Sequence, residues 1–416
     1  MIRNKLNKFI LLFSLLILLT GCWDQIQIDR SSYVVAIGID KAEKEGQIKL
    51  TYLITNPEYG PQQQTNKAEP PSRIMTFIVD DLISAKDIAS TVTSKIITYD
   101  ILRYIFVSEE LAQEKNIIRW MYDFSKDIEI RRDSNFIVTK EAAGKYLENS
   151  RPPFEQKPYK YFELSIENSV KSGMIPVNSQ LLHYYRVMEA NDDLFLAIYS
   201  TTEENDTSTK KDEDNFTAGE LHVEGQPNKN QFAGSALFNS GKMIGKLTGS
   251  ETRLSILLNH TLDAPDMLTT FPDPFDDRYR IAASMNSIKP VTVKMDLEGK
   301  TPTISVHLPL KIDLLTNHSM TDYTNNLENI ARLKSSIQAN LTDKMELLIK
   351  KTQEEFKAQP FGWSLIARKE FNSIPKFEAF NWKKKYPDMD VDISITIEIG
   401  QFGTQSSVPN IKEVKE

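Results

Sequence analysis

The chain has 416 residues, which is enough for two or three domains at about 150 residues each. Its net charge is −7, and 40% of its residues are hydrophobic, as is usual for a folded protein. An acidic chain argues against binding to nucleic acid, because that interaction needs a concentrated basic face. The only cysteine, Cys22, excludes an internal disulfide and a metal site built from several cysteines.

Residues 1–21 are typical of a secretory signal peptide. Three basic residues precede an apolar run at 9–19, which is too short to span a bilayer core of about 30 Å. The run ends in Leu-Thr-Gly-Cys, which is typical of a bacterial lipobox, where the thiol receives a diacylglyceryl group and small residues permit cleavage. A buried free thiol is the alternative, but the boundary of a leader is an unusual place for one. We expect lipidation of Cys22 and a body held outside the cytoplasm by two acyl chains.

The first half of the mature chain alternates apolar strands with amphipathic helices. Strands are expected at 33–40, 48–55, 73–79, 102–107 and 136–138. Helices are expected from 81, where apolar residues recur at helical spacing up to 97, from 109 to 124 and at 140–147. Residues 56–72, rich in proline and glutamine, predict a loop. This alternation predicts a mixed α/β domain.

The second half begins after a proline-rich connector at 150–158. A helix is expected up to 172, strands at 194–199, 291–297, 303–315 and 391–399, and a helix of about thirty residues at 324–356. Residues 201–215 contain no apolar side chain and predict a solvated loop. Residues 231–251 predict a strand, a glycine turn and a second strand, followed by a helix at 252–259.

No motif in the chain predicts catalysis, a cofactor or a metal. Residues 241–247 superficially resemble a phosphate-binding loop, but only three residues separate the glycines, and leucine follows the lysine. The five histidines are far apart in the sequence, and the acidic residues of 201–215 lack the spacing of a calcium-binding EF-hand. The residues themselves therefore point to no enzyme class, no cofactor and no metal ion.

Several segments, taken in order, resemble the Ger(x)C spore germination proteins, the lipoprotein C subunits of nutrient germinant receptors in endospore-forming bacteria. The resembling segments are 22–24 (CWD), 34–40 (VVAIGID), 127–132 (DIEIRR), the 234–251 hairpin, 360–362 (PFG) and 381–399. Two positions depart from the family pattern. Gln27 stands where glutamate is expected, and Gln359 stands where the family tends to have an aspartate-containing turn.

The resemblance implies an α+β, mixed α/β fold with three consecutive small domains, each a sheet flanked by helices, and no catalytic activity. Together with the element pattern it predicts a signal peptide at 1–21 and domains at 22–190, 191–284 and 285–416. The resemblance also implies that the protein is located on the outer face of the inner spore membrane, beside two membrane-spanning receptor subunits of the A and B types. The role implied is receptor assembly and signalling.

The glycine-containing hairpin supplies a candidate interface for a partner subunit, formed by Gly234, Phe238, Lys242 and Gly245. The alternative is that its glycines serve only tight turns, where they adopt backbone angles that other residues avoid. Two other functions stay open at this point. One is a solute-binding lipoprotein of a membrane transporter, with two lobes around a cleft, and the other is a cell-wall hydrolase, suggested by location alone.

Overall fold

The computed structural model describes residues 30–55, 70, 72–150, 155, 157–190, 192–204, 214–225, 228–299 and 301–403. The predicted signal peptide, Cys22 and Gln27 lie outside the described residues, as do most of the loops predicted at 56–72 and 201–215. Within the described residues, no helix is both long enough and apolar enough to cross a membrane.

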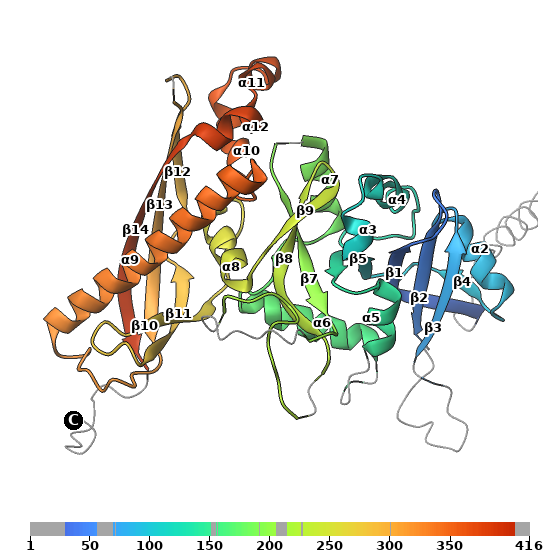
Figure 1. Ribbon diagram of the computed structural model, residues 1–416, viewed down its shortest axis with the longest axis horizontal. Helices are drawn as coiled ribbons and strands as arrows, with labels where there is room; N and C mark the ends of the chain where they lie inside the picture. Colours follow the sequence, from blue (N-terminus) through green and yellow to red (C-terminus); the bar gives the residue numbers. More distant parts are fainter. Residues whose placement is uncertain are drawn as a thin grey trace, which may run out of the picture.

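The first of two sheets among the described residues contains nine strands, ordered β3-β2-β1-β5-β6-β7-β8-β9, and β4 pairs with the start of β1 (Figure 1). The strands are β1 (Ser31–Lys41), β2 (Ile48–Thr55), β3 (Ser72–Val79), β4 (Ile96–Thr98), β5 (Tyr104–Ser108), β6 (Asn135–Thr139), β7 (Phe195–Thr201), β8 (Gln231–Asn239) and β9 (Lys242–Leu247). Strands β1, β5, β6 and β7 run parallel, with helices in the connections. The predicted alternation of strands and helices is therefore confirmed.

Helices cover both faces of this sheet. One face packs against α2 (Ser84–Thr91), α3 (Glu109–Ala112), α4 (Ile117–Asp123) and α7 (Leu181–Ala190), and the other against α5 (Ala143–Asn149) and α6 (Pro158–Lys171). Burial on both faces explains why β1 is a continuous apolar run, since Ile37 and Val35 enter opposite cores. The single helix predicted at 109–124 is two short helices in the structure. The helical pattern predicted from 81 to 97 is wrong at its end, because α2 stops at Thr91 and Ile96 and Ile97 pair with β1 as part of β4.

The motif at 34–40 is explained by the contact between β1 and α5. A Cβ atom on Gly38 would lie 3.1–3.2 Å from Leu147 and Ala143, so glycine lets the helix approach the strand. The buried carboxylate of Asp40 accepts hydrogen bonds from the backbone N–H groups of Ala143 and Gly144, at 2.6 and 2.9 Å. Asp40 thus caps the positive end of a helix that is distant in sequence.

The second sheet contains five strands in the order β10-β11-β13-β12, and β14 pairs with the other edge of β13. Its strands are β10 (Met267–Pro272), β11 (Arg280–Ser287), β12 (Thr292–Asp296), β13 (Thr303–Leu314) and β14 (Asp390–Phe402). The length of β13 follows from its pairing, because β12 and β11 lie end to end along one of its edges. Alternate residues of β13 are buried, and helix α9 lies across this sheet (Figure 1).

The remaining helices are α8 (Gly249–Leu258), α9 (Leu327–Lys351), α10 (Trp363–Ala367), α11 (Ile374–Phe380) and α12 (Trp382–Lys385). The helix predicted at 324–356 begins later, because Asn326 caps it by accepting hydrogen bonds from the N–H groups of Glu328 and Asn329. Its last turn, Thr352–Phe356, is π-helical.

The predicted fold class is confirmed, because sheets flanked by helices make up the described chain. The predicted domain borders, however, do not coincide with the borders of the sheets. The border at 190/191 falls between β6 and β7, which are neighbours in one sheet, and the border at 284/285 falls inside β11. The division into three domains stays a prediction about folding units.

Candidate functional site

The hairpin of β8 and β9 lies where the two sheets meet. Phe238 is fully buried and packs against Phe136, Tyr184 and Phe195, with ring centroids 5.1, 6.0 and 6.1 Å apart. Gly234 has a φ of +84°, and a Cβ atom there would lie 2.4 Å from the carbonyl oxygen of Leu247. Both residues therefore have roles in packing within the chain.

The other two residues of the candidate interface differ in exposure. A Cβ atom on Gly245 would lie 2.5 Å from the ring of Phe356, which follows α9, so glycine makes room for this contact between the two halves of the chain. Lys242 is exposed and is the member of the set whose side chain can meet another molecule. Contact of these residues with a partner subunit stays a prediction.

Several polar contacts join the two halves around this hairpin, in a region that we call the inter-sheet junction. Lys383 Nζ donates to Asn239 Oδ1 at 2.6 Å, and Lys351 Nζ pairs with Glu251 Oε1 at 2.8 Å. The backbone N–H of Leu194 donates to the carbonyl of Gln359 at 2.9 Å. Hydrophobic contacts are also continuous here, since one core runs from β8, β9 and α8 into the second sheet.

The inter-sheet junction contains a carboxylate that no sequence motif marks. Asp193 Oδ2 accepts a hydrogen bond from Ser364 Oγ at 2.6 Å, and Asp193 Oδ1 accepts one from Gln359 Nε2. Burial raises the pKa of Asp193 to about 7, against the lowering effect of the Ser364 hydrogen bond, and neighbouring Asp192 raises it further. Part of the residue reaches the surface, but its carboxylate is enclosed by its partners.

The segment at 360–362 also lies in the junction. Phe361 and Trp363 are fully buried, and Trp363 Nε1 donates to the carbonyl of Leu258 at 3.1 Å. Gln359, which departs from the family pattern, accepts a hydrogen bond from the N–H of Phe361 on its side-chain oxygen at 2.5 Å. The amide therefore makes the turn contact that an aspartate would make, while its nitrogen reaches Asp193.

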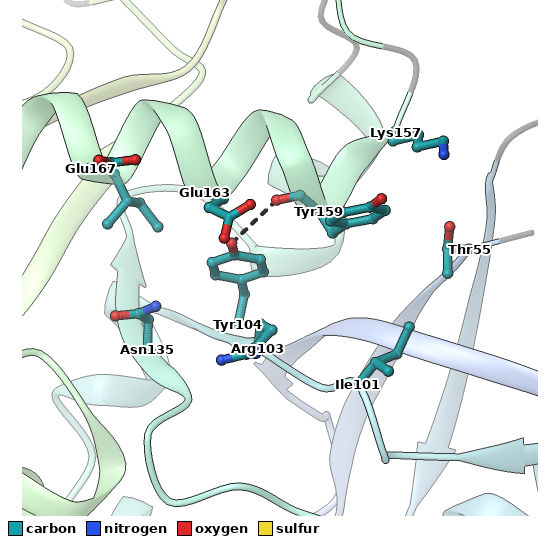
Figure 2. Close-up of a pocket in the computed structure, with 10 residues that line it drawn as sticks. Thr55, Ile101, Arg103, Tyr104, Asn135, Lys157, Tyr159, Glu163 and Glu167 are labelled. Carbon is teal, nitrogen blue, oxygen red and sulfur yellow. Dashed lines mark hydrogen bonds between the residues drawn. The ribbon is translucent and has the colours of Figure 1, made fainter. Parts of the chain in front are cut away.

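A second feature is an open cleft of about 730 Å³ between α6 and the ends of β2, β5 and β6 (Figure 2). It is lined by Thr55, Ile101, Arg103, Tyr104, Asn135, Lys157, Tyr159, Glu163, Ile166 and Glu167. Tyr104 donates its hydroxyl to the carbonyl of Tyr159 at 3.2 Å. Burial raises the pKa of Tyr104, and the nearby Glu163 carboxylate raises it further, so the phenol stays protonated.

The cleft has the size of a small-molecule site and carries charges of both signs, but its charged side chains are exposed. No sequence motif marks these residues, which come from four elements. Within the described ranges, no group of three or more His, Cys, Asp or Glu side chains is arranged to hold a metal ion.

Comparison with known proteins identifies the family. The model for the spore germination protein N-terminal domain matches residues 24–201, and the model described as "Spore germination B3/GerAC like, C-terminal" matches residues 233–403. The chain belongs to the Ger(x)C family of spore germination proteins. The two matched regions meet within one sheet, because β7 ends the first and β8 lies in the second.

Individual relatives agree with this membership of the Ger(x)C family. Spore germination protein B3 of Bacillus subtilis (strain 168) is 23% identical, over 96% of this chain and 98% of that protein. Spore germination protein YndF of the same organism is 21% identical, over 97% and 98% respectively. The crystal structure of the GerBC protein has the same fold, with a TM-score of 0.53 and 18% identity over 90% of this chain and 99% of that one.

Proposed function

We propose that this chain is the lipid-anchored C subunit of a spore nutrient germinant receptor, and that it supports receptor assembly and signalling without catalysing a reaction. The observation that carries the proposal is the match of both family regions, which together extend over most of the mature chain. The lipobox at Cys22 supplies the anchor. The proposed partners are two membrane-spanning subunits, of the A and B types, in the inner spore membrane.

The matched regions and the relatives named above are spore germination proteins, which favours germination over solute transport. The names of these relatives give no support to a cell-wall hydrolase. The acidic charge of the chain argues against nucleic acid as a partner, which agrees with a role in binding other proteins.

The anchor is tested by Cys22→Ala in the spore-forming host. We expect the variant to be lost from the membrane fraction, because Cys22 is the only cysteine and no other residue can form the thioether to the lipid. We also expect spores that carry the variant to respond poorly to nutrients. Immunoblots of whole sporangia control for loss of the protein itself. Normal membrane localisation and normal germination of this variant would show that the anchor is wrong.

Assembly is tested by isolating the chain from detergent-solubilised spore membranes. We expect two polytopic proteins to co-purify with it, and we expect their genes to lie beside its own. Recovery of the chain alone, from a preparation in which both candidate partners are present and intact, would contradict the role in assembly.

A further inference from the structure

Three aliphatic side chains, just after α2, at the start of β4 and in the turn at 127–129, are unusually exposed. Ile128 is 99% exposed, Ile96 67% and Val92 66%. We call these three residues the exit patch. Single exposed aliphatic residues are common on protein surfaces, so the argument depends on how these three are held and where they lie.

Hydrogen bonds and ion pairs tie together the segments that carry the exit patch. The N–H of Ile97 donates to Ser90 Oγ at 3.3 Å, which joins β4 to α2. Lys86 of α2 pairs with Asp127 at 2.8 Å and with Glu129 at 3.0 Å, on either side of Ile128.

The turn that carries Ile128 is also joined to the end of β4. Glu129 accepts hydrogen bonds from the N–H of Tyr99 at 2.8 Å and from Thr98 Oγ1 at 3.2 Å. The residues on both sides of Ile128 are therefore held in place, and the isoleucine between them is presented to solvent. This gives the 127–132 motif a structural purpose, which is to fix this turn against α2 and β4.

Two residues of the exit patch, Ile96 and Val92, lie beside the point where the described chain begins, since Val92 lines the same pocket as Ser31. In the parallel pairing of β4 with β1, Ile96 is the partner of Ser31, and Thr98 is the partner of Tyr33. Nine residue steps separate Ser31 from Cys22, so even a fully extended connection spans only about 30 Å. Figure 1 shows α2 and β4 at one end of the molecule and the second sheet at the other.

We propose that the exit patch docks on the phospholipid surface of the membrane that holds the anchor, with Ile96, Ile128 and Val92 entering the interfacial layer. The proposal rests on the proposed lipid anchor, which keeps a membrane within reach of this end. Apolar contact, not charge, supplies the attraction, since the exposed acids Asp87 and Asp100 lie in the same region as Lys95. Docking would fix the orientation of both sheets relative to the membrane.

The test uses the mature chain, residues 22–416, coupled through Cys22 to a maleimide lipid in vesicles of phosphatidylcholine and phosphatidylglycerol. Because Cys22 is the only thiol, this tether forms whether or not cells lipidate the chain. In a Trp23→Phe background, Ile96→Trp and Ile128→Trp each add one reporter to the exit patch. The matched control is Leu347→Trp. Leu347 is also 67% exposed, but it lies on α9, the helix that covers the second sheet.

Lipids with brominated acyl chains quench indoles that enter the bilayer. We expect the added fluorescence at positions 96 and 128 to fall to about half or less, and that at position 347 to stay unchanged, as apolar side chains partition into the interface. Quenching at 96 and 128 no greater than at 347 would overturn the proposal. Matching thermal unfolding of all three variants in solution confirms that they are folded.

The double variant Ile96→Asp/Ile128→Asp, tested in spores, distinguishes docking on lipid from docking on a partner protein. The measurement is the rate of nutrient-triggered germination. If this variant impairs germination while the vesicle assay shows no quenching, the exit patch binds a protein and the lipid proposal is wrong. The vesicle result does not depend on cellular lipidation, so failure of the Cys22→Ala prediction and failure of this proposal are distinguishable.

Discussion

Replacing Asp193 with asparagine tests whether the inter-sheet junction responds to pH. The carboxylate is held by Ser364 and Gln359 of the C-terminal half, and its pKa is raised from 3.8 to about 7 by burial. When the pKa of a carboxyl is higher in the folded state than in the unfolded state, its protonated form stabilises the fold. The whole of this contribution to the free energy of unfolding is present at pH values below the unfolded-state pKa. This stability is lost as the pH rises from about 4 to about 7.

The magnitude follows from the size of the shift. About three pKa units correspond to roughly 4 kcal/mol, at about 1.4 kcal/mol per unit. Because part of Asp193 reaches the surface, solvent screening reduces this figure, and we expect about 2 kcal/mol. The side-chain amide in Asp193→Asn would keep both hydrogen bonds without the charge, accepting from Gln359 through its oxygen and donating to Ser364 Oγ through its nitrogen.

The assay is urea unfolding of residues 22–416 at pH 5 and pH 8. We expect Asp193→Asn to be more stable than the natural chain at pH 8 by about 2 kcal/mol, with less than half of that difference at pH 5. Asp133→Asn is the control, because the pKa of Asp133 is lowered, with the Arg131 hydrogen bond as the largest cause, and its effect has the opposite sign. Equal stability of the natural chain and Asp193→Asn at both pH values would refute the reasoning.

Three further predictions concern the fold and the hairpin. Gly245→Ala should lower the free energy of unfolding by roughly 1–3 kcal/mol, because the added methyl group clashes with Phe356. In a double-mutant cycle measured by urea unfolding, Phe356→Leu should recover part of this loss. Equal losses with and without Phe356→Leu would contradict the contact. Asp40→Ala removes the cap of α5 and should cost about 1–2 kcal/mol, measured by the same method, whereas a neutral result would show that water replaces the carboxylate. Lys242→Glu should leave the melting temperature unchanged, because the side chain is exposed. It should slow nutrient-triggered germination, because it reverses a charge at the proposed interface with a partner subunit. Normal germination rates would remove Lys242 from that interface.

The local elements were largely predictable from the sequence, because side-chain periodicity depends on neighbouring residues alone. The run at 33–40 identifies β1, and alternation identifies β13 and β14. Helices α7 and α10 to α12 and strands β4, β10 and β11 were not predicted. The buried residues of α7 (Leu181, Tyr184 and Tyr185) recur at helical spacing, and those of β11 (Ile281, Ala283 and Met285) alternate, so the sequence does carry a pattern that could have predicted both elements.

The inter-sheet junction shows why the site could not be predicted in the same way. Gly245 was singled out for its place in a hairpin, but its neighbour Phe356 is more than a hundred positions away. Asp193 belongs to no motif, and its raised pKa exists only because folding encloses it with Ser364 and Gln359. Enclosure of this kind depends on tertiary packing, which no local pattern encodes.

The sequence by itself determined the alternation of strands and helices and the resemblance to the Ger(x)C family, and it predicts a leader that ends just before the single thiol. These depend on local composition, on short-range periodicity and on ordered motifs. Only the tertiary structure decided that β1 to β9 form one sheet across the predicted domain border, that Phe238 is internal and that Ile128 is exposed. The physical reason is that strand pairing and burial are set by contacts between distant residues, and the free energy of those contacts exists only in the assembled fold.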